Sequence, residues 1–98
     1  MKRENLTVVA RIVARQGTVE ELKAELLKLV TPTRQEEGCI EYTLHQDNAD
    51  PAAFIFTETW ASAAALDAHM NSPHFQRYIS AVGAMVQEKQ VHLLTRIA

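Results

Sequence analysis

The 98-residue sequence contains one cysteine, three glycines, three prolines and no long apolar run. Because Cys39 is the only cysteine, no disulfide can form within the chain, which indicates a reducing compartment. No apolar stretch approaches the roughly 18 residues needed to cross a membrane. No signal-peptide core follows the segment Met1–Asn5. The composition therefore predicts a soluble cytoplasmic protein that has no membrane partner.

An excess of charge of one sign is also missing. Ten Lys and Arg residues against twelve Asp and Glu residues give a net charge of −2 at pH 7. Domains that bind nucleic acid usually carry a basic face, so nucleic acid is not an expected partner. The three glycines, Gly17, Gly38 and Gly83, lie too far apart to form a glycine-rich phosphate loop.

The length corresponds to a single domain that spans residues 1–98. Four segments show the alternation and the β-branched or aromatic content typical of strands. These predicted strands are Leu6–Ala14, Cys39–Gln46, Ala53–Trp60 and Val91–Ile97. The turn sequence DNADP separates the second strand from the third, so these two strands should form a hairpin.

A first helix is predicted between the first two strands. Apolar residues recur with helical period from Val19 onward, after a capping box formed by Thr18 and Glu21. Pro32 should kink or end this helix, with a possible extra turn before Gly38 stops it.

Two further helices are predicted after the third strand, and each begins with a serine that can cap it. Ser62 precedes a short helix that ends at about Met70. Ser72, followed by Pro73 at the first helical position, begins a second helix that extends to about Met85.

The resulting order, β-α-β-β-α-β, is the ferredoxin-like arrangement, an α+β fold with a four-stranded antiparallel sheet. Apolar residues lie on both sides of the strands: Val8 and Val9 point in opposite directions in the first strand, and Phe54 and Ile55 do so in the third. The helices can cover only one face, so the second face predicts a homodimer that packs sheet against sheet. The alternative is a one-sided sheet whose Val and Thr side chains face water, as antiparallel sheets often do.

Two segments are distinctive: EEGCIEY, from Glu36 to Tyr42, and TETWASAAALDAHMNSPHFQRYISAV, from Thr57 to Val82. The second places Glu-x-Trp on the third strand, then a histidine, then a Ser-Pro-His junction. With the order of elements, these segments resemble the antibiotic biosynthesis monooxygenase family over nearly the whole chain. The likeness is closest to the quinol monooxygenase branch.

This resemblance implies a dimeric α/β barrel that oxidises a small aromatic or quinol-type substrate with molecular oxygen, O2, and without metal or organic cofactor. Haem-degrading relatives carry an Asn on the first strand and a His in the second helical region. Ala10 and Ile79 occupy these positions here, so haem degradation is not expected. Because other relatives are isomerases or have no known activity, two alternatives stay open. One is an isomerase or lyase, and the other is a non-catalytic ligand-binding or stress-related module.

Three residues are candidates for catalysis of such an oxidation, which requires a base, a donor for an oxyanion and a dry pocket. His69 follows Leu66 by three residues, so both should face the sheet, and an imidazole has a pKa close to working pH. Glu58 lies among aromatic residues and could act as the base or orient His69. Tyr42 could donate its hydroxyl to a substrate oxygen. Structural roles are the alternative for all three: a helix-end histidine, a paired carboxylate and a buried tyrosine.

Four residues are candidates for substrate binding. Trp60 and Phe56 share a face of the third strand with Glu58 and would form the pocket wall or simply the core. His74 and Tyr78 lie four residues apart on one face of the last helix, where they could line the same pocket or serve only in packing.

A metal site is not expected from the spacing of the histidines. His69 and His74 are five residues apart, whereas ligand pairs on one helix are four apart, and Ser72-Pro73 starts a new helix between them. Cys39 has no CxxC partner and no evident base, so it is not a predicted nucleophile.

Overall fold

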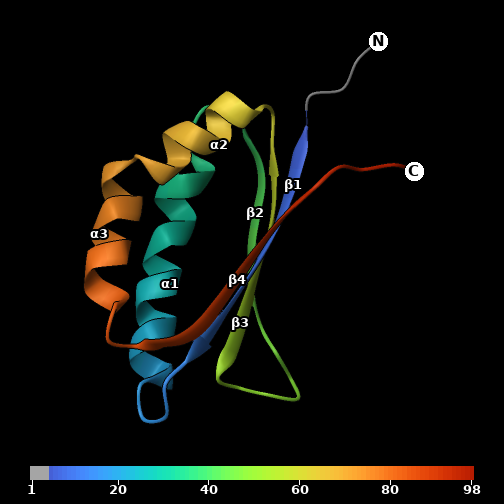
Figure 1. The fold of residues 1–98 in the computed structure, drawn as a ribbon. Helices are drawn as coiled ribbons and strands as arrows, with labels where there is room; N and C mark the ends of the chain where they lie inside the picture. Colours follow the sequence, from blue (N-terminus) through green and yellow to red (C-terminus); the bar gives the residue numbers. More distant parts are fainter. Residues whose placement is uncertain (1–4) are drawn as a thin grey trace.

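The computed structural model describes residues 5–98 and contains four strands and three helices (Figure 1). Residues 1–4, which belong to the segment Met1–Asn5 for which no signal peptide is expected, lie outside this range. The elements, in chain order, are β1 (Leu6–Ala14), α1 (Val19–Arg34), β2 (Cys39–Gln46), β3 (Ala53–Trp60), α2 (Ala63–Met70), α3 (Pro73–Val82) and β4 (Val86–Leu94). None of the helices in residues 5–98 is long and apolar enough to cross a membrane.

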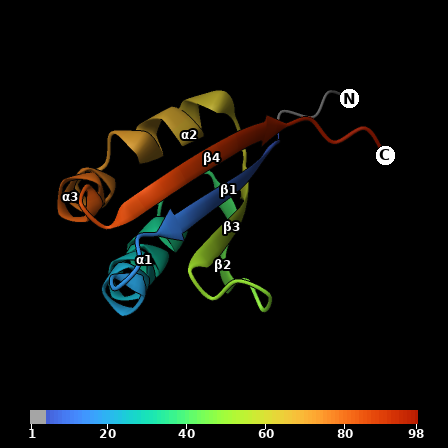
Figure 2. The same cartoon turned by 60° about the horizontal axis from the view of Figure 1, so that its bottom comes forward.

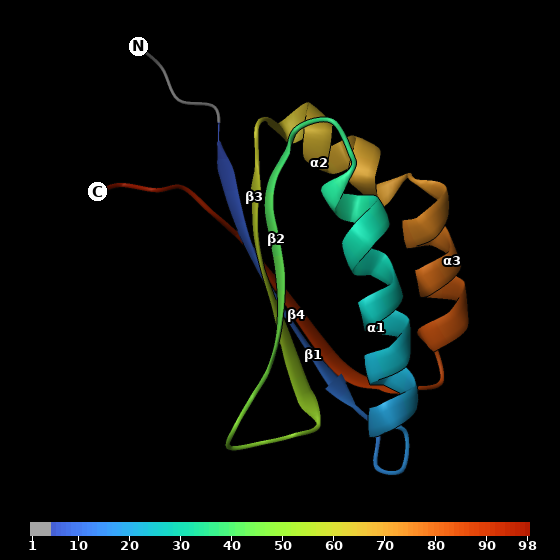
Figure 3. The same cartoon turned by 180° about the vertical axis from the view of Figure 1, so that it is seen from behind.

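The four strands form one antiparallel sheet in the order β2-β3-β1-β4. All three helices lie on the same side of this sheet, as Figures 1 and 3 show from opposite directions. The predicted ferredoxin-like fold is therefore confirmed, with its second helical region divided into α2 and α3 as the two serine caps indicated.

The helix-covered face of the sheet carries the core. Along β3, buried and partly buried residues alternate from Phe54 to Trp60, so Phe54, Phe56, Glu58 and Trp60 all point toward the helices. Val8 of β1 pairs directly with Glu58 and is buried on the same face. The predicted division of the strand residues between two faces is therefore confirmed.

Two boundaries differ from those predicted. The third helix ends at Val82 rather than about Met85, and β4 runs from Val86 to Leu94 rather than from Val91 to Ile97. The sequence of the first half of β4 is mainly polar, since β4 is an edge strand and all of its residues after Val86 are exposed. Alternating hydrophobicity marks a strand only where one face is buried, so these residues carried no strand signal.

The start of α1 also differs from its prediction. Thr18 precedes the helix, but its side chain makes no capping hydrogen bond. Its hydroxyl donates instead to the carbonyl oxygens of Arg15 and Met85, which ties the β1–α1 turn to the chain before β4.

The end of α1 lies beyond Pro32. The helix continues through this proline to Arg34, so Pro32 does not end it.

The turn after α1 is held close to α2 by Gly38. This glycine has φ +87°, and a Cβ at this position would lie 2.5 Å from the Cβ of Ala65 in α2. The Gly38 carbonyl oxygen also accepts a hydrogen bond from the Ala61 amide at 2.8 Å. Glycine therefore meets two requirements here: a left-handed backbone and the absence of a side chain against a neighbouring helix.

We expect Gly38→Ala to lower the free energy of unfolding by clearly more than Gly17→Ala. Gly17 has the same φ of +87°, but a Cβ there would meet nothing within 4 Å. Gly17→Ala should therefore cost only the left-handed strain of about 1–2 kcal/mol, whereas Gly38→Ala adds the clash with Ala65. Urea unfolding of both variants measures the difference. Equal losses would show that the approach of the turn to α2 is not constrained.

Candidate functional site

A cavity of about 150 Å³ lies between the sheet and the helices. Its walls are almost entirely apolar, and a cavity of similar size in another protein holds one benzene ring. Val8, Ala10 and Ile12 of β1 form part of its floor, and Lys89, Val91 and Leu93 of β4 lie along one side. Figure 2 shows β1 and β4 side by side in the sheet. The cavity thus suits a small, largely apolar ring system.

His69 brings a polar group to this cavity from the last turn of α2. Leu66, one turn earlier, lines the cavity with it, as the three-residue spacing predicted. The His69 side chain is 3% exposed, and its ring centroid lies 4.8 Å from that of Trp60 and 4.9 Å from that of Phe75. Burial lowers the pKa of His69, while the hydrogen bond and charge of Glu36 oppose this shift. The imidazole is therefore held mainly neutral at pH 7.

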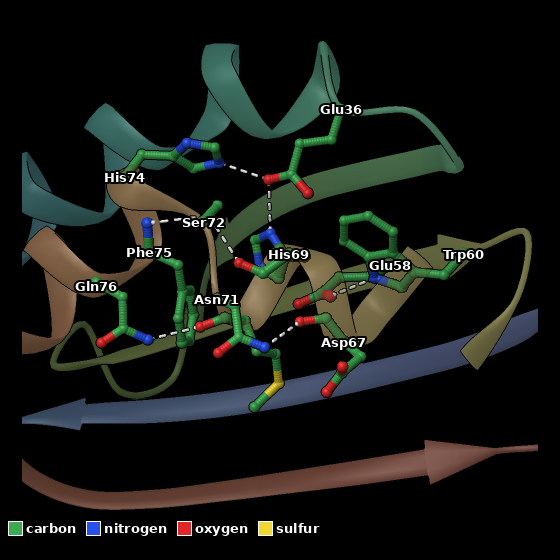
Figure 4. A network of polar contacts seen from close by, with 11 residues as sticks. Glu36, Glu58, Trp60, Asp67, His69, Asn71, Ser72, His74, Phe75 and Gln76 are labelled. Carbon is green, nitrogen blue, oxygen red and sulfur yellow. Dashed lines mark hydrogen bonds and ion pairs between the residues drawn. The ribbon is translucent and has the colours of Figure 1, made fainter. Parts of the chain in front are cut away.

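Glu36, in the turn after α1, joins the two histidines of the second helical region (Figure 4). Its Oε2 accepts hydrogen bonds from Nδ1 of His69 at 2.9 Å and from Nε2 of His74 at 2.5 Å. A carboxylate can only accept, so each of these nitrogens carries its proton. In His69 this leaves Nε2 as the acceptor nitrogen, and Nε2 has no hydrogen-bond partner among residues 5–98.

His69 and His74 come together although they are five residues apart and lie on different helices, because the break between α2 and α3 turns the chain. Ser72 occupies this break: its Oγ accepts from the Phe75 amide at 3.3 Å and donates to the His69 carbonyl oxygen at 2.7 Å. The two helices are thereby held at a fixed junction, and α3 leaves in a new direction. His74, in the first turn of α3, then reaches the same carboxylate oxygen as His69.

Glu58 and Trp60 form a buried pair on β3. The indole Nε1 of Trp60 donates to Oε1 of Glu58 at 2.8 Å, and both side chains are buried. Burial raises the pKa of Glu58 to about 6, although the Trp60 hydrogen bond opposes this shift. Glu58 therefore has the satisfied partner that a buried carboxyl group requires, and it still lines the cavity.

Aromatic side chains complete the walls of the cavity. Tyr42 of β2 stacks on Phe56 with ring centroids 4.7 Å apart and meets His69 edge-on at 5.6 Å. Burial, followed by the charge of Glu58, raises the pKa of Tyr42 above its ordinary value. Burial also raises the pKa of Tyr78 to about 12. Both phenols therefore stay protonated at pH 7 and remain hydrogen-bond donors.

The structure brings most of the predicted site residues to one place. His69, Glu58, Tyr42, Phe56 and Tyr78 all line the cavity. The other two predicted residues, Trp60 and His74, lie behind this wall, where Trp60 holds Glu58 and His74 contacts Glu36.

Glu36 is not among the site residues predicted from the sequence. It belongs to the distinctive segment EEGCIEY, and it lies two residues before the glycine that brings the turn against α2. These two features mark the turn, but no local pattern links residue 36 to residues 69 and 74.

Comparison with known proteins identifies the family. The model of the family described as "Antibiotic biosynthesis monooxygenase" matches residues 5–81. The Escherichia coli protein named "Probable quinol monooxygenase YgiN" is 32% identical over 99 aligned residues, which cover 91% of this chain and 95% of that protein.

Solved structures agree with this result. The crystal structure of PA3566 from Pseudomonas aeruginosa has a TM-score of 0.95 and 40% identity, covering 100% of this chain and 99% of that one. The structure of Rv0793 from Mycobacterium tuberculosis has a TM-score of 0.91 and 31% identity, covering 97% of each chain. The chain belongs to the antibiotic biosynthesis monooxygenase family.

Proposed function

We propose that this protein is a cofactor-independent monooxygenase that oxidises a small quinol or polyphenol with O2. One observation supports this most directly: a buried imidazole lines an apolar cavity while its Nδ1 is held by a carboxylate. This arrangement suits a substrate that is an aromatic ring carrying an ionisable hydroxyl group. The single cysteine fits a cytoplasmic location for the protein.

His69 is the base in this proposal. Glu36 fixes the proton on Nδ1, so the Nε2 lone pair is available to take the proton of a phenolic hydroxyl. The imidazolium that forms is stabilised by the adjacent Glu36 carboxylate. This matters because burial alone disfavours a charged His69. Glu36 therefore acts as a positioning residue, in the manner of a carboxylate that orients a catalytic histidine.

Tyr42 and Glu58 orient the substrate. The Tyr42 hydroxyl remains protonated and can donate to the oxyanion that develops as His69 takes the proton. The Glu58 carboxylate can accept a hydrogen bond from a second hydroxyl on the ring, while Trp60 keeps its Oε1 in place. A ring with two hydroxyl groups, as in a quinol, uses both contacts.

The substrate itself supplies the electrons for the reaction. The phenolate transfers an electron to O2, and recombination forms a carbon–oxygen bond on the ring. Cleavage of the O–O bond then leaves one oxygen atom on the ring and releases the other as water. The ring loses its phenolic hydrogen and a ring hydrogen and becomes a quinone. The apolar walls suit both O2 and the exclusion of water from the reactive phenolate.

We also propose that the protein is a homodimer that packs through the uncovered face of the sheet. Val9 and Ile55 lie on this face and are only partly buried in the single chain. On β4, Leu94 pairs with Thr7 on the same face as Val9 and is 44% exposed. A second copy would cover apolar surface that a monomer leaves in water.

Oxygen uptake with a panel of quinols tests the proposed reaction. We expect O2 consumption that depends on both substrate and protein, and conversion of the phenol to a quinone. His69→Ala should lower kcat/KM by about 10²–10⁴-fold, the usual contribution of general acid–base catalysis. His74→Ala should lower it less than about tenfold, since His74 touches Glu36 and not the cavity. His45→Ala is the control, because His45 contacts neither the cavity nor Glu36; since it pairs with Ile55 on the uncovered face, its assembly is checked together with its activity.

Melting temperatures of the three variants distinguish lost chemistry from lost folding. Turnover that continues without oxygen would indicate an isomerase or lyase instead. A ligand that binds but is not converted under either condition would indicate a binding module.

The protonation of His69 and Glu58 should determine how kcat/KM depends on pH. Both His69 and Glu58 act deprotonated, so kcat/KM should fall as the pH drops through about 6, the pKa of Glu58, and below it. With two such groups, log(kcat/KM) should approach a slope of about two per pH unit on the acidic side. Glu58→Gln removes one group and should reduce this limiting slope to about one. An unchanged slope would exclude an ionised Glu58 from the reaction.

Sedimentation equilibrium at micromolar concentration tests the assembly. The wild-type protein should show a mass of about twice 11.0 kDa. Ile55→Lys places a charge on the uncovered face and should yield the monomer, since an unpaired charge is costly to bury. A wild-type monomer at these concentrations would contradict the dimer.

A further inference from the structure

Glu36, His69 and His74 present three potential metal ligands from three separate segments. Glu36 comes from the turn after α1, His69 from the end of α2 and His74 from the start of α3 (Figure 4). One ligand atom from each residue lies within 4.8 Å of the other two. We propose that these three side chains bind one divalent transition-metal ion, and that this ion is Zn²⁺.

The distances fit a metal ion that replaces the two shared protons. Zn²⁺ holds nitrogen and oxygen ligands at about 2.0–2.2 Å, which places tetrahedral ligand atoms about 3.3 Å apart. The two nitrogen atoms now lie 2.9 and 2.5 Å from Oε2 of Glu36. An outward movement of Glu36 by about 1 Å brings these separations to the value that a tetrahedral site needs. The fourth position is then available for water.

The ligand set selects the kind of ion. Two imidazoles and one carboxylate suit Zn²⁺, Co²⁺ or Ni²⁺, whereas Mg²⁺ and Ca²⁺ prefer oxygen ligands throughout. The site is also reachable from solvent, because the side chains of Glu36 and His74 are 14% and 17% exposed. His69, at 3%, forms the buried base of the site.

The backbone around the site restricts how far the ligands can move apart. Gly38 packs against Ala65, which holds the turn that carries Glu36 beside α2. Ser72 bonds to the His69 carbonyl and caps α3 at the Phe75 amide, which fixes the two histidines relative to each other. A site whose ligands are already gathered costs less ordering on binding than one assembled from mobile side chains.

Metal binding would change what His69 offers to the cavity. A metal on Nδ1 requires the lone pair of that nitrogen, so the ring proton must move to Nε2. His69 would then present a donor to the cavity in place of an acceptor. This consequence rests on the proposed role of His69 as the base, whereas the binding of Zn²⁺ does not.

Isothermal titration of the metal-free protein with Zn²⁺ tests the site directly. We expect one Zn²⁺ per chain and no comparable heat with Mg²⁺. Glu36→Gln and His74→Gln each remove one ligand and should weaken Zn²⁺ binding at least about tenfold. Mutation of a residue that only supports a metal ligand already weakens metal binding by about 10–100-fold. His45→Gln removes an exposed histidine that is no part of the cluster and should leave binding unchanged.

Nitrogen-15 NMR of the histidine side chains provides an independent measurement on the folded protein. Addition of Zn²⁺ should convert His69 from the Nδ1–H form to the Nε2–H form and should leave His45 unaffected. Absence of stoichiometric binding, or binding that Glu36→Gln and His74→Gln both retain in full, would overturn the proposal.

Inhibition separates this proposal from the proposed function. If both hold, Zn²⁺ should abolish turnover of the wild-type protein and of His45→Gln, and the residual activity of His74→Gln should resist it. Binding without any turnover by the metal-free protein would refute the oxygenase and leave the metal site standing. Turnover without binding would refute the metal site alone.

Discussion

The hydrogen bonds to the Glu36 carboxylate are the interaction on which the rest of this site depends. An imidazole that is 3% exposed among aromatic rings needs a polar partner, because an unpaired buried polar group is costly. Glu36 supplies that partner on one nitrogen only. The same oxygen also binds His74, so the turn after α1, the end of α2 and the start of α3 are fixed to one another. The other ring nitrogen, Nε2, has no hydrogen-bond partner among residues 5–98, and it is the atom that we propose as the base.

The same logic applies to the other ionisable group in the cavity wall. Glu58 is held by the Trp60 indole, which neutralises part of the cost of burying a carboxyl group. His69 and Glu58 thus each have a fixed partner behind the wall, and these partners, Glu36 and Trp60, do not themselves line the cavity. A polar group that is hydrogen-bonded on the side away from the cavity keeps its orientation when a ligand fills the cavity. Catalysis depends on polar groups that are already oriented before the substrate binds.

The sequence predicts the fold well where one face of an element is buried. The alternation in β3 and the serine caps at Ser62 and Ser72 each correspond to a local physical requirement, and the structure contains all of them. Prediction fails at β4, whose exposed first half carries no hydrophobic pattern. It also fails at Thr18, where a tertiary contact with Met85 replaces the expected cap. In both places the deciding interaction joins residues far apart in the chain, so local pattern does not contain it.

The candidate site shows the same limit more sharply. Within one uninterrupted helix, residues 69 and 74 would project about 140° apart, because each residue turns the helix by about 100°. The break at Ser72 removes that restriction, since a new helix axis begins between the two histidines. Spacing rules for ligand or catalytic pairs therefore apply only inside a continuous helix. A serine–proline pair between two candidate residues cancels such a rule, and it leaves open which third residue they share. Here that residue is Glu36, 33 positions before His69 in the chain, and only the tertiary fold brings it there.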